Sequence, residues 1–278
     1  MILAINYGDA PYKKVQHYNT KTAYKTGLVD QVIEYGPEDI DEEYRKEHEY
    51  AFILNDKRAG KFCLWRPRIL KDAYSKIDEG DFLIYADAGS FYYDDVHKLI
   101  AVMDRDKLNI MVFEDVNEEK KLSKRDIFVY LDADKEEFAE SNQRISTFFI
   151  LGKSEEATAF VEEYYRLTNE APFLFTDEDN RLGKENYEGF VDTRHNQSVL
   201  SLMTKRMGIQ SYRDPSQWGI YREAEARSNN TSDEVLARST FPRIFTHHRQ
   251  KKLDLLTRIR LERMYARKLA ELTNRGVV

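Results

Sequence analysis

The sequence has only one cysteine, Cys63, in 278 residues, so no intramolecular disulfide can form. That scarcity excludes the disulfide-rich secreted scaffolds and is typical of proteins in a reducing compartment. Cys63 lies among large apolar residues, where a buried, inert thiol is expected. No apolar run approaches the roughly 18 residues of a membrane-spanning helix, and the N-terminus lacks the pattern of a signal peptide. We therefore expect a cytoplasmic protein.

Proline and glycine are also scarce, with six and twelve residues, whereas there are eighteen tyrosines and fifteen phenylalanines. Such a composition excludes a disordered chain, which would be poor in aromatic residues. With 41% hydrophobic and 33% charged residues, the chain can bury a sizeable core under a polar surface. We expect one large globular domain with an appendage.

The net charge of −6 argues against a general nucleic-acid-binding protein. The charge is uneven, because residues 246–278 contain nine Lys or Arg against three acidic residues, which gives that segment +6 and the rest −12. Apolar residues at helical spacing in the basic segment predict an amphipathic helix. We divide the chain into a domain at 1–250 and a basic helical extension at 251–278. The extension has two interpretations: peripheral contact with the inner face of an anionic membrane, or packing against the acidic body or a second copy.

Apolar runs and helical patterns alternate along the first domain. Runs at 1–6, 28–36 and 81–86 read as strands, and the segments between them read as helices. This order predicts an α/β fold with a mostly parallel central sheet flanked by helices. Ligands bind at the carboxyl ends of such strands.

Asp87 follows the apolar run DFLIYA, so it belongs to that ligand-binding edge. A carboxylate there suits a hard cation such as Mg²⁺ or Mn²⁺, which prefers oxygen ligands. Gly89 has no Cβ and would let a ligand approach the backbone closely. A plain β-turn without a ligand is the alternative interpretation.

Three other segments carry polar side chains suited to a charged ligand. Cations surround Trp65 in KRAGKFCLWRP, where they suit a diphosphate, although a solvated basic loop has the same composition. A predicted helix starts within VDTRHNQSV at 191–199, and this start carries Asp192, Arg194, His195 and Gln197. A helix start of this kind can bind an anion, or it can be a plain polar cap. In the third, the imidazoles of His247 and His248 suit a divalent metal ion, and the cations that follow them suit a phosphate.

These segments carry a resemblance to a known family. The motifs, in order, are GKFCLWRP at 60–67, GDFLIYADAG at 80–89, SKRD at 123–126, NQRIS at 142–146, TRHNQSVLSL at 193–202 and HHR at 247–249. Over about residues 1–250 the chain resembles GT-A-type glycosyltransferases of the kind found in bacterial polysaccharide and capsule biosynthesis. The resemblance implies a Rossmann-like GT-A fold, a nucleotide-sugar donor, with UDP expected, and a saccharide or lipid-linked acceptor.

The resemblance also implies site residues. Donor binding is expected from Asn6, Tyr7, Arg58, Lys61, Trp65, Arg66, Asp87, Ala88 and Gly89. Acceptor binding is expected from Lys124, Arg125, Gln143 and Arg194, and a divalent cation, Mn²⁺ or Mg²⁺, from Asp87 and His247. Catalytic roles fall to Asp192, Gln197 and His195.

Two departures from the family pattern bear on the chemistry. The usual Asp-x-Asp is Asp87-Ala88-Gly89, which leaves one carboxylate for a metal, and Asn196 stands where relatives often have an aspartate that can accept a proton. Two mechanisms stay open. Asp192 could act as the base of an inverting transfer, or Gln197 or a neighbour could stabilise the transition state of a retaining one. Two other functions also stay open. The protein could be a nucleotidyltransferase, which should show a glycine-rich loop after the first strand, or a binding or scaffold protein without catalysis.

Overall fold

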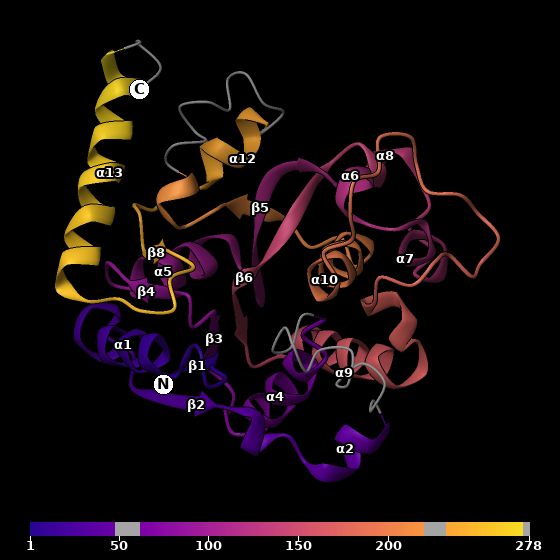
Figure 1. Ribbon diagram of the computed structural model, residues 1–278, viewed down its shortest axis with the longest axis horizontal. Coiled ribbons are helices and arrows are strands. Elements are labelled where there is room, and N and C mark those ends of the chain that lie inside the picture. The colour runs from indigo at the N-terminus through magenta and orange to yellow at the C-terminus, as the bar shows by residue number, and fades with distance from the viewer. Residues whose placement is uncertain (48–61, 220–231, 275–278) are drawn as a thin grey trace.

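A six-stranded sheet forms the centre of the computed structural model, which describes residues 1–47, 62–219 and 232–274 (Figure 1). The strand order is β2-β1-β3-β6-β5-β7. The strands are β1 (Ile2–Tyr7), β2 (Gln31–Tyr35), β3 (Phe82–Ala86), β5 (Ile110–Glu118), β6 (Asn142–Gly152) and β7 (Ser211–Arg213). The predicted runs at 1–6, 28–36 and 81–86 thus form three adjacent strands of one sheet.

The sheet is mostly parallel, which confirms the predicted fold class, but β6 departs from a purely parallel order. β1 pairs in parallel with β2 and β3, and β5 pairs in parallel with β7. β6 is antiparallel to both of its neighbours, β3 and β5. All eleven residues of β6 are buried, so its apolar pattern gives no indication of its direction.

Helices cover both faces of the sheet. The longer ones are α1 (Lys13–Thr22), α4 (Trp65–Tyr74), α5 (His97–Asp106), α9 (Glu155–Glu170), α10 (Asn196–Arg206) and α13 (Leu255–Asn274). The shorter ones are α2 (Glu42–Glu47), α6 (Glu119–Leu122), α7 (Arg125–Tyr130), α8 (Glu136–Ala139) and α12 (Asp233–Arg238). α9 begins as the sequence predicts, because Ser154 Oγ accepts a hydrogen bond of 3.1 Å from the Ala157 amide.

Alternation along the strands divides the core into two layers. Leu3 and Ile5 of β1 point into the layer formed with α4, α9 and α10. Ile2 and Ala4 point into the opposite layer, formed with α5 and with Phe245. This two-sided burial explains why the central strands read as continuous apolar runs rather than as alternating ones.

A two-stranded sheet that the sequence does not predict joins distant parts of the chain. β4 (Ser90–Tyr92) pairs antiparallel with β8 (Phe245–His247), and Ser90 lies opposite His247. β4 follows the end of β3 by only a few residues. The pairing therefore fixes the histidine segment beside Asp87.

The predicted C-terminal amphipathic helix is present as α13, and one side of it packs against the body. Tyr265 is buried, and Glu262 forms an ion pair of 2.9 Å with Arg243. Its other side exposes Leu255 and Leu256. The predicted membrane contact and self-association of this helix remain predictions. Within the described ranges, no helix has the length and apolar character needed to cross a membrane.

Candidate active site

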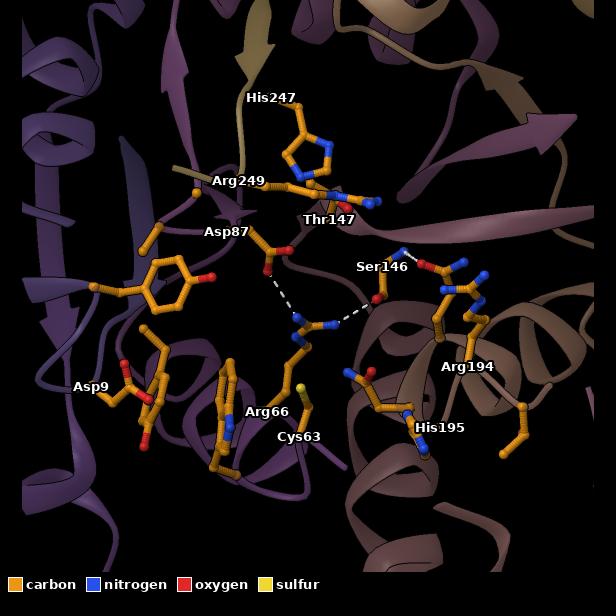
Figure 2. Close-up of a pocket in the computed structure, with 18 of the residues that line it drawn as sticks. Asp9, Cys63, Arg66, Asp87, Ser146, Thr147, Arg194, His195, His247 and Arg249 are labelled. Atoms are coloured by element: carbon orange, nitrogen blue, oxygen red, sulfur yellow. Dashed lines mark hydrogen bonds and ion pairs between the residues drawn. The ribbon is translucent and has the colours of Figure 1, made fainter. Parts of the chain in front are cut away.

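A cavity of about 530 Å³ opens at the carboxyl ends of β1 and β3 (Figure 2). It collects side chains from the ends of both strands, the start of α4, β6, the start of α10 and the segment after β8. The predicted site residues in its lining are Tyr7, Trp65, Arg66, Asp87, Ala88, Gly89, Asp192, Arg194, His195, Gln197 and His247. Segments separated by up to 240 residues therefore meet where the sequence places the ligand edge.

One wall of the cavity is aromatic. Tyr7, at the end of β1, stacks on Trp65, at the start of α4, with ring centroids 3.8 Å apart and planes 13° from parallel. Burial raises the pKa of the Tyr7 hydroxyl, so the ring stays neutral at physiological pH. A flat, uncharged stack of this kind is suited to a nucleobase or a sugar face.

Arg66 and Asp87 form a fixed ion pair in the wall of the cavity. Arg66 Nη2 lies 2.8 Å from Asp87 Oδ1, and Arg66 Nη1 donates to Ser146 Oγ at 2.6 Å (Figure 2). The Tyr85 hydroxyl also donates to Asp87 Oδ1, at 2.6 Å. Burial lowers the pKa of Arg66, but its neighbours, with Tyr85 and Asp87 foremost, together raise it by more, so the guanidinium keeps its charge.

The Gln197 amide is held in one orientation. Its Nε2 donates to Gln143 Oε1 at 2.7 Å, and its Oε1 accepts from the Ser146 backbone at 3.3 Å. Gln143 is fully buried behind the cavity, and its own Nε2 donates to Glu119 Oε1 at 3.1 Å. A buried polar network thus orients a glutamine side chain at the cavity wall.

His195 begins α10 in a strained conformation. Its φ of 53° is rare for a residue with a side chain and is typical of functional sites and tight turns. Its Nε2 lies 2.6 Å from Asp177 Oδ1. Asp192 and Arg194, on the segment just before, line the cavity at its exposed rim.

Several predicted site residues lie elsewhere. Asn6 is buried under the cavity, where its amide pairs with Gln16 and Asn19. Asn19 in turn donates to the Ser90 carbonyl at 3.0 Å, so Asn6 supports the loop after β3 from below. Gln143 acts from behind Gln197, as described above. Arg58 and Lys61 fall outside the described residues.

Lys124 and Arg125 do not line this cavity. Lys124 lies in a neighbouring cavity of about 510 Å³, which shares Asp192 with the first, and its Nζ donates to the Glu178 carbonyl at 3.0 Å. Arg125 forms an ion pair of 2.8 Å with Asp134 and packs on the Tyr187 ring. Arg125 therefore has a structural partner of its own.

The Asp134 cluster gives a pH-dependent prediction. Burial raises the pKa of Asp134, but hydrogen bonds from Lys184, Tyr187 and Arg125 outweigh it and hold the pKa at about 2, below its ordinary 3.8. A lowered carboxyl pKa stabilises the fold above pH 4, and this contribution is lost as the pH falls toward 2. Asp134→Asn should cost about 1 to 2 kcal/mol of unfolding free energy at pH 7.

Urea denaturation at several pH values measures this effect. The difference between the wild type and Asp134→Asn should shrink between pH 4 and pH 2, whereas the exposed-site control Asp104→Asn should match the wild type throughout. A constant difference across that range would show that the ion cluster does not carry the effect.

Other residues of the lining were not predicted as site residues, and Arg249 is the main one. It is exposed, and it adopts a positive φ of 55°. The sequence signal for it was present in the cations that follow His247 and His248. Cys63 also lines the cavity, and burial raises the pKa of its thiol to about 11, so it is protonated at neutral pH.

A further cavity of about 340 Å³ adjoins the first on the side of α13. The two cavities share Thr147, Gln197, His247 and Arg249. Trp218 and Tyr265 lie in the lining of the smaller one. Gln197 is therefore common to both cavities.

The residues at the predicted metal position do not fit a divalent cation. Asp87 and His247 both line the cavity, but Asp87 is already paired with Arg66, and Gly89 supplies no second carboxylate. In residues 1–47, 62–219 and 232–274, no group of three or more His, Cys, Asp or Glu side chains could hold an ion.

Comparisons with known proteins agree with the fold. No protein-family model matches the sequence, and no curated protein is significantly similar to it. Among solved structures, the galactosyltransferase LgtC in complex with donor and acceptor sugar analogues has a TM-score of 0.51 at 12% identity, and the alignment covers 100% of both chains.

Two further glycosyltransferases match less closely. WbbM, a bifunctional glycosyltransferase, has a TM-score of 0.48 at 10% identity over 88% of this chain and 45% of its own. GlyE of Streptococcus pneumoniae TIGR4 has a TM-score of 0.42 at 13% identity over 99% and 64% respectively. The likeness to LgtC, at 12% identity, is one of fold, and by it this chain has the GT-A fold of glycosyltransferases.

Proposed function

We propose that the protein is a glycosyltransferase, of the hexosyltransferase class, that uses a nucleoside-diphosphate sugar. The expected donor is a UDP-sugar, and the expected acceptor is a saccharide or a lipid-linked saccharide in polysaccharide or glycan synthesis. One observation carries the proposal. An aromatic stack, a fixed Arg66–Asp87 pair and the oriented Gln197 amide converge in one cavity at the ligand-binding edge of the sheet.

In this proposal the donor spans the larger cavity. The base lies against Tyr7 and Trp65, because a planar ring gains from stacking on an aromatic side chain. The sugar lies toward Arg66, Asp87 and Gln197, which offer the paired donors and acceptors that sugar hydroxyls need. The diphosphate lies between them.

The acceptor enters from the adjoining cavity, because Gln197 is shared by both. An acceptor hydroxyl oxygen forms the new bond to the anomeric carbon, and the bond from that carbon to the β-phosphate oxygen breaks. The electron pair of the broken bond leaves with the diphosphate, and the hydroxyl proton passes either to Asp192 or to the leaving phosphate. The first route corresponds to inversion and the second to retention.

A thermal-shift screen of nucleotide sugars tests the donor assignment. At saturating ligand, at least one UDP-sugar should raise the melting temperature, because a ligand that binds only the folded state stabilises it. Tyr7→Leu should remove most of this shift, and Tyr24→Leu, which changes a half-exposed tyrosine outside the cavity, should leave it intact. A screen in which no nucleotide sugar shifts the wild type would contradict the proposal.

A further inference from the structure

The carboxylate expected to hold a metal ion is already bound within the protein. Asp87 Oδ1 accepts hydrogen bonds from Tyr85 and from Arg66, whose side chain is only 5% exposed. The guanidinium is fixed in turn by Ser146. A divalent cation bound by the Asp87 carboxylate would therefore meet an immobile positive charge that lies 2.8 Å from Oδ1 of the same group.

Backbone packs closely against the neighbouring position. Gly89 stands two residues after Asp87, and its carbonyl accepts the backbone N–H groups of His248 at 2.8 Å and Arg249 at 3.1 Å. These bonds extend the β4–β8 pairing and fix Arg249 directly against the loop. The segment after β8 thus packs against the position that would carry a second carboxylate.

Arg249 delivers a positive charge to this position. A Cβ at Gly89 would lie 3.5 Å from Arg249 Cα. Arg249 has a positive φ, and its side chain lines the cavity. In the view of Figure 2, its side chain lies between those of His247 and Asp87. No described residue forms a hydrogen bond or an ion pair with its guanidinium, so the charge is available to a ligand.

We propose that Arg249 takes the place of a divalent cation and neutralises the leaving diphosphate, so that donor binding and transfer need no metal. This inference rests on the proposed function. A guanidinium is charged at any physiological pH and binds phosphate oxygens through paired N–H groups. As the bond between the anomeric carbon and the phosphate oxygen breaks, the charge that develops on that oxygen faces Arg249, and no proton is transferred to or from the arginine.

Calorimetric titration with UDP, GDP and CDP tests this role in two buffers, one with EDTA and one with MnCl₂. At least one of these nucleotides should bind with the same affinity in both. Arg249→Met should weaken that binding about tenfold to a hundredfold in both, the loss expected for hydrogen bonds to a charged group. Lys252→Met, which removes an exposed charge of the same basic segment outside the cavity lining, should bind like the wild type.

The outcomes separate the two proposals. Binding that requires manganese would overturn the role of Arg249 and leave the donor cavity in place. Binding that is metal-independent but unaffected by Arg249→Met would overturn that role as well. No binding of any nucleoside diphosphate in either buffer would overturn both the arginine and the donor assignment.

Discussion

Urea denaturation of Arg66→Met is expected to show a loss of about 3 kcal/mol in unfolding free energy, the usual cost of removing one partner from a buried ion pair. The guanidinium neutralises Asp87 and donates to Ser146. Without it, the Tyr85 hydroxyl is the one side-chain partner left to the carboxylate among the described residues, and the Ser146 hydroxyl loses its donor. The loss should appear in the unfolding free energy and also as lost nucleotide-sugar binding.

Arg68→Met is the matched control for this prediction. Arg68 lies on the same helix and pairs with Asp41 at 2.8 Å, but both side chains are partly exposed. An exposed pair is worth about 0 to 1 kcal/mol, so this variant should remain close to the wild type. Similar losses in the two variants would mean that burial of the Arg66 pair does not matter. If Arg66→Met does not fold, Asp87→Asn tests the same pair with a smaller change.

Gln197→Ala is expected to reduce turnover about a hundredfold or more, and to weaken donor binding by a much smaller factor. A preoriented hydrogen-bonding group at the reacting centre contributes about 3 kcal/mol to transition-state stabilisation. The amide of Gln197 is preoriented by Gln143 and Ser146, and it borders both cavities. Steady-state kinetics with the best donor of the screen measures the effect.

Gln143→Met separates positioning from direct contact. Gln143 does not line the cavity, so its loss should act by freeing the Gln197 amide to rotate. The variant should therefore reduce kcat by a smaller factor than Gln197→Ala does, with little change in KM. Gln210→Ala alters an exposed glutamine that is in none of the three cavity linings and should be neutral. A Gln197→Ala variant with wild-type kcat would exclude this residue from the reaction.

The sequence predicts much of this fold and the place of the candidate site. Asp87 follows a continuous apolar run, so its position at the ligand edge follows from strand order alone. The polar cluster before α10 likewise lies at a helix start, as predicted. Both features depend on local pattern, which a single sequence shows directly.

Features that depend on long-range pairing are not visible in the sequence. β4 and β8 are three residues each, too short to show a period, yet their pairing fixes Arg249 beside Gly89. The direction of β6 is hidden because all of its residues are buried. A sequence motif also does not show which residues its side chains contact. Arg125 pairs with Asp134, and Asn6 pairs with Gln16 and Asn19, so these predicted site residues lie away from the cavity.

Product analysis with a nucleotide sugar tests the central claim most directly. Incubation with the donor selected by the thermal-shift screen and a mixture of saccharide acceptors should release the nucleoside diphosphate, detected by chromatography, and Gln197→Ala should release far less. Pyrophosphate release from a nucleoside triphosphate and a sugar 1-phosphate would instead identify a nucleotidyltransferase. Nucleotide-sugar binding without any release of diphosphate would contradict the claim that the protein transfers a sugar.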